Sequence, residues 1–92
     1  MSFSPPIPQN KERAKRLFSA WLKGMLARHK IKAILLGQQS GFTQNDIYRW
    51  TSGRSLPSIL GLYAIVSALS ELTGIDQGKL HKDIYNALES KS

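Results

Sequence analysis

The chain has 92 residues, and its 13 Lys and Arg against six Asp and Glu give a formal net charge of +7 at pH 7. This length suits one domain with a modest core and excludes a binding module joined to a separate enzyme domain. The absence of cysteine excludes disulfides and thiolate metal sites.

The positive charge is concentrated in the first third of the chain. Residues 1–32 hold eight basic side chains and one acid, whereas residues 33–92 hold five of each sign. This imbalance favours a polyanionic partner, and the alternative is that a basic segment only keeps the protein soluble. No signal-peptide pattern or apolar run of about 18 residues is present, so we expect no membrane partner.

The first predicted elements are an arm and a long helix. Residues 1–10 contain three prolines and two serines, which favours a flexible arm. Asn10 is the expected N-cap of the helix that follows. Apolar residues then recur at spacings of three and four, which predicts one buried face: Ala14, Leu17, Phe18, Trp21, Leu22, Met25 and Leu26.

Four more helices are predicted, over residues 32–39, 44–51, 59–72 and from about residue 76 onward. Gly41 and Gly53 permit the turns after the second and third helices, and Ser58 and Asp76 are the expected N-caps of the last two. The apolar faces of these last two helices are expected to be Ile59, Leu62, Ile65, Val66 and Leu69, then Leu80, Ile84, Ala87 and Leu88. No strand alternation of useful length occurs, so the predicted class is all-α, divided into an arm (1–10), a core (11–74) and a C-terminal amphipathic helix (75–92).

Residues around Gly41 have the spacing of a helix-turn-helix. The side chains expected to meet at the crossing are small or apolar, and Gly37 permits close approach of the two helices; they are Leu36, Gly37, Phe42, Ile47 and Trp50. A plain helical hairpin shares some of these features. Thr43 and Asp46 have capping-box spacing, although an acid at 46 is also able to accept a hydrogen bond from cytosine.

The segment 31–58 resembles the helix-turn-helix of lambdoid phage repressors and Cro proteins, also called the Xre family. The matching residues are Thr43-Gln44, Ile47, Arg49-Trp50, Gly53-Arg54 and Pro57-Ser58. The resemblance implies a five-helix, lambda-repressor-like DNA-binding domain, usually dimeric, that acts as a transcriptional regulator in the bacterial cytoplasm, at the nucleoid. Repressors of this kind occur in phages and mobile elements.

Three positions depart from the family pattern. Lys32-Ala33 stands where the family often has a capping residue followed by a phosphate-binding glutamine, so Lys32 is a candidate point charge for that phosphate. Ser40 replaces a usually apolar residue, which is expected to loosen the crossing. Ile34 and Leu35 replace usually polar residues, and we expect them to extend the core rather than form a contact surface.

Three sets of site residues follow, with double-stranded DNA as the expected partner and helix 43–51 in the major groove. Amide and guanidinium groups on its outer face are able to read base edges, which assigns base contacts to Gln44, Asn45, Tyr48 and Arg49. Cations and hydroxyls at the ends of the motif are expected to contact phosphates: Lys30, Lys32, Thr43, Ser52, Arg54 and Ser55. The stripe of the last helix is assigned either to homodimerisation or to the chain's own core: Leu80, Ile84, Tyr85 and Leu88.

Other functions remain as alternatives. An antitoxin-type autorepressor has the same fold and size, with a toxin as its protein partner. A protein-interaction adaptor without DNA binding is favoured if Ile34 and Leu35 are exposed. An enzyme is not expected, because His29 and His81 are the only histidines and the acids are scattered. We therefore expect no catalytic residue, no metal ion and no cofactor.

Overall fold

The computed structural model describes residues 7–89, with side chains from residue 11 onward. Five helices make up this region of the chain: α1 (Ile7–Arg28), α2 (Ala33–Ser40), α3 (Gln44–Thr51), α4 (Ile59–Thr73) and α5 (Gln77–Leu88). No strand occurs between residues 7 and 89. The predicted all-α class and the number of helices are confirmed.

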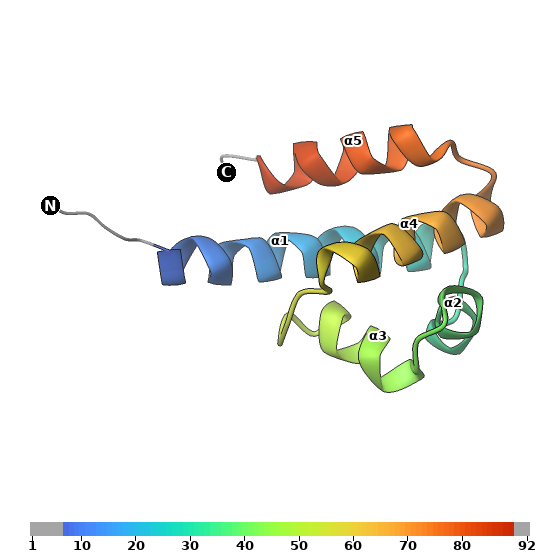
Figure 1. Ribbon diagram of the computed structural model, residues 1–92, viewed down its shortest axis with the longest axis horizontal. Coiled ribbons are helices and arrows are strands. Elements are labelled where there is room, and N and C mark those ends of the chain that lie inside the picture. Colours follow the sequence, from blue (N-terminus) through green and yellow to red (C-terminus); the bar gives the residue numbers. More distant parts are fainter. Residues whose placement is uncertain (1–6, 90–92) are drawn as a thin grey trace, which may run out of the picture.

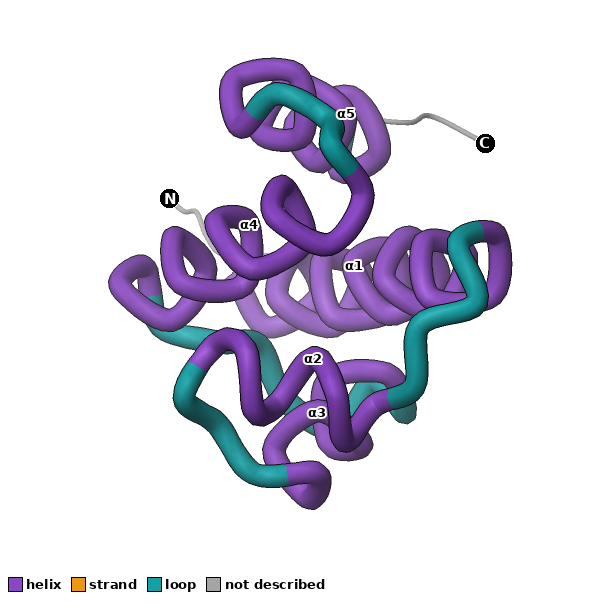
Figure 2. Tube along the Cα trace, turned by 90° about the vertical axis from the view of Figure 1, so that its right-hand side faces the viewer, coloured by secondary structure: helices purple, strands orange, loops and turns teal. Residues whose placement is uncertain are grey.

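The helices form three levels. Figure 1 shows α2 and α3 beneath α1 and α4, with α5 above them, and Figure 2 shows the same levels after a quarter turn. α1 packs against α3 and α5, while α4 packs against α2 and α5. The two longest helices therefore form a central layer from which α3 is held at one surface of the molecule.

The start of α1 differs from the prediction. The helix begins at Ile7, so Asn10 lies within it and is not its N-cap. Pro8 is compatible with this start because the first turn of a helix leaves its N–H groups without intrahelical partners, and a proline there loses no hydrogen bond. The expectation of an arm is therefore wrong for residues 7–10, which are helical, and its residues 1–6 lie outside the described residues.

The other helix ends follow the predicted signals. Thr43 and Asp46 form a capping box at α3, and Ser58 and Asp76 cap α4 and α5 through their side chains. Gly41 ends α2 with a φ of 87°, in the left-handed region that glycine adopts without strain. Lys32 at the start of α2 makes no side-chain capping hydrogen bond.

The core is a single cluster to which every helix contributes. Its largest fully buried side chains are Phe18, Leu22, Leu36, Ile47, Ile65, Leu69, Leu80 and Val66. Leu80 and Ile84 of α5 belong to it, with 0% and 4% exposure, so these two candidates for the dimer interface serve the chain's own core instead. Tyr85 and Leu88, on the outer side of α5, remain exposed.

Three apolar residues expected in the core lie at the surface. Ile34 and Leu35 are 48% and 41% exposed, because α2 is only eight residues long and turns Leu36 and Gly37 inward. Ile59, the first residue of α4, is 71% exposed. Ser40 does not leave an unsatisfied hydroxyl in the crossing, since its Oγ donates to the carbonyl oxygen of Leu36 at 2.7 Å.

The turn between α2 and α3 depends on Gly37. A Cβ at this position would lie 2.7 Å from the carbonyl oxygen of Phe42 and 3.3 Å from the carbonyl carbon of Thr43. The Gly37 carbonyl oxygen accepts hydrogen bonds from the N–H groups of Gly41 and Phe42, both at 2.8 Å. The close approach predicted for Gly37 is thus to the backbone at the start of α3.

Gly37→Ala is therefore expected to destabilise the protein by roughly 1–3 kcal/mol, because backbone atoms must move to admit the methyl group. Gly24→Ala is the matched control, since a Cβ at this position has no neighbour within 4 Å. The substitution also replaces a glycine in the interior of α1 with a better helix former. It should stabilise the protein by about 0.5–1 kcal/mol. Urea unfolding of both variants measures the difference, and equal effects would contradict the assignment.

Candidate nucleic-acid interface

α3 is anchored through its inner face. Ile47 and Trp50 are 0% and 5% exposed, and the ring of Phe42 meets Trp50 edge-on with the centroids 4.9 Å apart. At the end of the helix, Ser19 Oγ of α1 donates to the carbonyl oxygen of Thr51. Packing fixes the rotation of the helix about its own axis, and the hydrogen bond fixes its C-terminal end.

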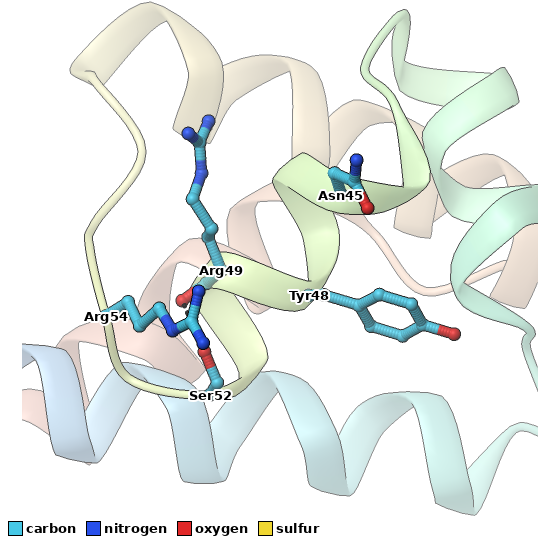
Figure 3. Close-up of a pocket in the computed structure, with 5 residues that line it drawn as sticks. All are labelled: Asn45, Tyr48, Arg49, Ser52 and Arg54. Carbon is cyan, nitrogen blue, oxygen red and sulfur yellow. Dashed lines mark hydrogen bonds between the residues drawn. The ribbon is translucent and has the colours of Figure 1, made fainter.

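The outer face of α3 is polar and exposed. All four side chains expected to contact bases, Gln44, Asn45, Tyr48 and Arg49, lie on it. An open hollow of about 550 Å³ lies along this face. The side chains that line it, drawn in Figure 3, are Asn45, Tyr48, Arg49, Ser52 and Arg54. The structure thus brings three of the expected base-contacting residues together with two of the expected phosphate-contacting residues.

The long side chains of this face are paired with one another. Gln44 Nε2 donates to Tyr48 Oη at 2.9 Å, one turn further along α3. Arg49 Nη2 lies 2.6 Å from Asp46 Oδ1 in an ion pair. Pairing restricts the rotamers of three exposed residues and of the half-buried Asp46, so these side chains are ordered before any partner binds.

Asp46 connects the cap of α3 to this outer face. Its Oδ2 accepts from the Thr43 backbone N–H at 3.2 Å, and its own N–H donates to Thr43 Oγ1 at 3.1 Å. The hydrogen bond from the Thr43 N–H is the largest cause of a lowered Asp46 pKa, and the Arg49 guanidinium lowers it further. Asp46 is therefore ionised at neutral pH and orients Arg49.

Expected phosphate contacts lie at both ends of the motif. Lys30 and Lys32 are exposed on the connection from α1 to α2. Arg54 and Ser55 lie on the loop from α3 to α4. In Figure 1 these two connections lie at opposite ends of the α2–α3 pair. Thr43 and Ser52, the two expected hydroxyl contacts, flank α3 as its N-cap and C-cap. Both have local hydrogen bonds, because Thr43 caps the helix through its side chain and Ser52 Oγ donates to the Arg49 carbonyl oxygen at 3.2 Å.

Lys30 has an unusual backbone for a lysine. Its φ of 57° lies in the left-handed region, and it is the only non-glycine residue with a positive φ within the described chain. The Ile31 N–H donates back to the Leu26 carbonyl oxygen at 2.9 Å, which closes α1 in the manner of a Schellman turn. Glycine is the residue that fits this position without strain, so Lys30 places a cation here at a conformational cost of about 1 kcal/mol.

The described residues offer no metal site and no single membrane-spanning helix. Within residues 11–89, no three His, Asp or Glu side chains are grouped so that they could hold a metal ion. None of the described helices is individually long and apolar enough to cross a membrane, and only α4 and α5 taken together as a bent pair meet that test.

Two features of the interface were not inferred from the sequence. One is the pairing on the outer face, which the i, i+4 spacing of Gln44 and Tyr48 and the i, i+3 spacing of Asp46 and Arg49 would have indicated. The other is the hydrogen bond from Ser19 to α3. No local pattern indicates this bond, because its two residues are 32 positions apart.

The lowered Asp46 pKa predicts a pH dependence of stability. The ionised Asp46 carboxylate stabilises the folded protein fully when the pH is above 3.8, the ordinary pKa of Asp. This stabilisation is lost as the pH falls through the lower pKa that Asp46 has in the folded protein. Asp46→Asn removes the charge but keeps an acceptor oxygen. We expect the variant to have the lower Tm at neutral pH, with the difference vanishing in strong acid. A Tm difference that does not change with pH would contradict this role of the carboxylate.

Comparisons of the chain with protein-family models, with curated proteins and with solved structures found no match. Its function is therefore inferred from the site itself. The features that carry the inference are the exposed polar face of α3, the buried face that anchors it, and the cations at both ends of the motif.

Proposed function

We propose that this protein is a sequence-specific, double-stranded DNA-binding regulator of transcription, acting as a repressor, that inserts α3 into the major groove. The observation that carries the proposal is the two-sided character of α3. Ile47 and Trp50 anchor one side in the core, while Gln44, Asn45 and Arg49 stand exposed on the other.

The dimensions of α3 suit a major groove. An α-helix with its side chains is about 10–12 Å across, and the major groove of B-DNA is about 12 Å wide. The described chain has α2 and α3 at its lower surface in Figure 1, so a duplex is able to approach α3 without moving another helix. The side-chain amide of Gln or Asn forms two hydrogen bonds with adenine, and the guanidinium of Arg forms two with guanine. Each such pair contributes roughly 1–3 kcal/mol of discrimination against an incorrect base.

The side-chain pairs support specific rather than purely electrostatic recognition. Arg49 exchanges its bond to Asp46 for one to a guanine edge, and the carboxylate repels phosphates that would otherwise compete for the same position. Gln44 similarly exchanges its hydrogen bond to Tyr48 for a hydrogen bond to a base.

Affinity would come from the phosphates on either side of the groove. Lys30 and Lys32 stand at one end of the motif and Arg54 and Ser55 at the other. The start of α2 has no side-chain cap, so its first N–H groups are able to bind a phosphate beside Lys32. Two domains bound about one helical turn apart supply the specificity that one short half-site lacks, which makes a homodimer the expected state on DNA.

One observation favours a second function. Ile34 and Leu35 are about half exposed, which suits a protein partner on α2, such as the toxin of an antitoxin-type autorepressor or the target of an adaptor. Titration with random-sequence DNA at low salt separates the adaptor from the regulator. An adaptor without measurable DNA binding, despite its charge of +7, would replace the regulator proposal.

Selection of bound DNA from a random pool tests the assigned roles. Gln44→Ala should change the selected base at one position in each half-site, whereas Arg54→Ala should weaken all sites alike, because phosphate contacts carry no sequence information. Gln77→Ala, which removes an exposed glutamine from α5, is the matched control and should change neither. If both variants lost discrimination between DNA sequences to the same extent, the assignment of Gln44 to a base and of Arg54 to a phosphate would be refuted.

Lys30→Gly separates stability from DNA affinity. Relief of the left-handed backbone should stabilise the protein by about 0.5–1 kcal/mol, while loss of one phosphate contact should reduce the slope of log K against log salt by about 0.9. Thermal unfolding and DNA titrations at several salt concentrations measure the two effects. Lys82→Ala, an exposed cation on α5, should leave the slope unchanged. An unchanged slope in Lys30→Gly would remove Lys30 from the interface.

A further inference from the structure

The middle of the outer face of α3 carries an aromatic side chain among polar ones. Gln44, Tyr48 and Ser52 follow one another at intervals of four residues and form one row along the helix, and Asn45 and Arg49 form the row beside it. The Tyr48 side chain is 52% exposed, and it is the only large apolar side chain exposed on α3. An uncharged ring therefore occupies the centre of a surface that is otherwise polar.

The ring of Tyr48 extends away from the helix. Figure 3 shows its side chain on the side of α3 away from Arg54, with the hydroxyl at the far end. The hydroxyl oxygen accepts from Gln44 Nε2 at 2.9 Å, so the hydrogen bond of Tyr48 is made at the tip of the ring. No other aromatic ring of the described chain is stacked on it. The apolar faces of the ring are therefore open to a partner.

The major groove of DNA offers one kind of apolar group to such a ring. Base edges present hydrogen-bond donors and acceptors there, and the exception is the methyl group on C5 of thymine. Methylation of cytosine at C5 puts the same group at the same place on the other pyrimidine. A ring that covers the N7 or O6 acceptor of a purine would displace water from that atom without supplying a donor, which costs free energy. The most favourable place for the ring is therefore against a C5 methyl group.

We propose that Tyr48 is a specificity-determining residue whose ring binds the C5 methyl group of a pyrimidine in the major groove. This inference rests on the proposed function and deepens it, because it names the chemical group that the centre of the outer face of α3 selects. The ring keeps its place when Gln44 turns to a base, because the buried Ile47 and Trp50 fix the rotation of α3. Amides and a guanidinium then read polar base edges, while the ring reads a methyl group between them.

Replacing each thymine of the selected half-site with uracil tests the contact, because the change removes one methyl group and no hydrogen-bonding atom. Duplexes with a single half-site keep dimerisation out of the measured affinity. For the wild type we expect one position at which uracil weakens binding about fourfold, which corresponds to the burial of one methyl group at about 0.8 kcal/mol. With cytosine at that position, 5-methylcytosine should bind about fourfold more tightly than cytosine. An effect in the first arm alone identifies thymine as the source of the methyl group, and an effect in both arms means that either base supplies it.

Variants of Tyr48 show whether the ring is responsible for the methyl effect. Tyr48→Ala should abolish it, and the fold should be retained because alanine is a good helix former at this exposed position. Tyr48→Phe removes only the hydroxyl and should keep the effect. Leu60→Ala, which removes an exposed apolar side chain from α4, is the matched control and should also keep it. Wild type and Tyr48→Ala, each measured with and without the methyl group, form a double-mutant cycle in which effects of the methyl group on the DNA itself cancel.

The outcomes separate this inference from the proposed function. A wild type that selects a DNA sequence but shows no methyl effect at any pyrimidine would overturn the inference and leave the proposed function intact. The same holds for a methyl effect that persists in Tyr48→Ala. A methyl effect that is lost in Tyr48→Phe would also overturn the inference, because the hydroxyl and not the ring would then be responsible. A wild type that selects no DNA sequence would refute the proposed function, and the inference with it.

Discussion

The burial of Ile47 and Trp50 is the constraint on which the exposed polar face of α3 depends. These two side chains share the inner face of an eight-residue helix that is too short to be stable in water by itself. Their packing against α1, α2 and Phe42 determines which residues of α3 are left outside. Gly37 makes this packing possible, because a larger residue would collide with the backbone at the start of α3.

The polar face that results is ordered by short-range pairs within α3. Asp46 serves the helix twice, as the partner of Thr43 in the cap and as the acceptor for Arg49. A single carboxylate therefore links the stability of the helix start to the position of the cation most suited to guanine. The Arg49 side chain remains 55% exposed in this ion pair.

Charge and apolar surface are separated in this small domain. Basic residues are concentrated in the first third of the chain, whereas Ile59 and Leu60, which begin α4 after the loop that carries Arg54, are 71% and 76% exposed.

Local signals in the sequence determined the helices, most of their ends and the exposed face of α3, because caps, turn glycines and apolar spacing act over a few residues. That this face binds DNA remains a proposal. Only the tertiary structure decided which apolar faces are covered, because residues of a helical stripe are buried only where another helix lies over them. The pattern alone assigned Ile34, Leu35 and Ile59 to the core and left Leu80 and Ile84 open between a dimer and the chain's own core. α5 folds back and covers Leu80 and Ile84, while no described helix covers Ile59 or the outer side of α2.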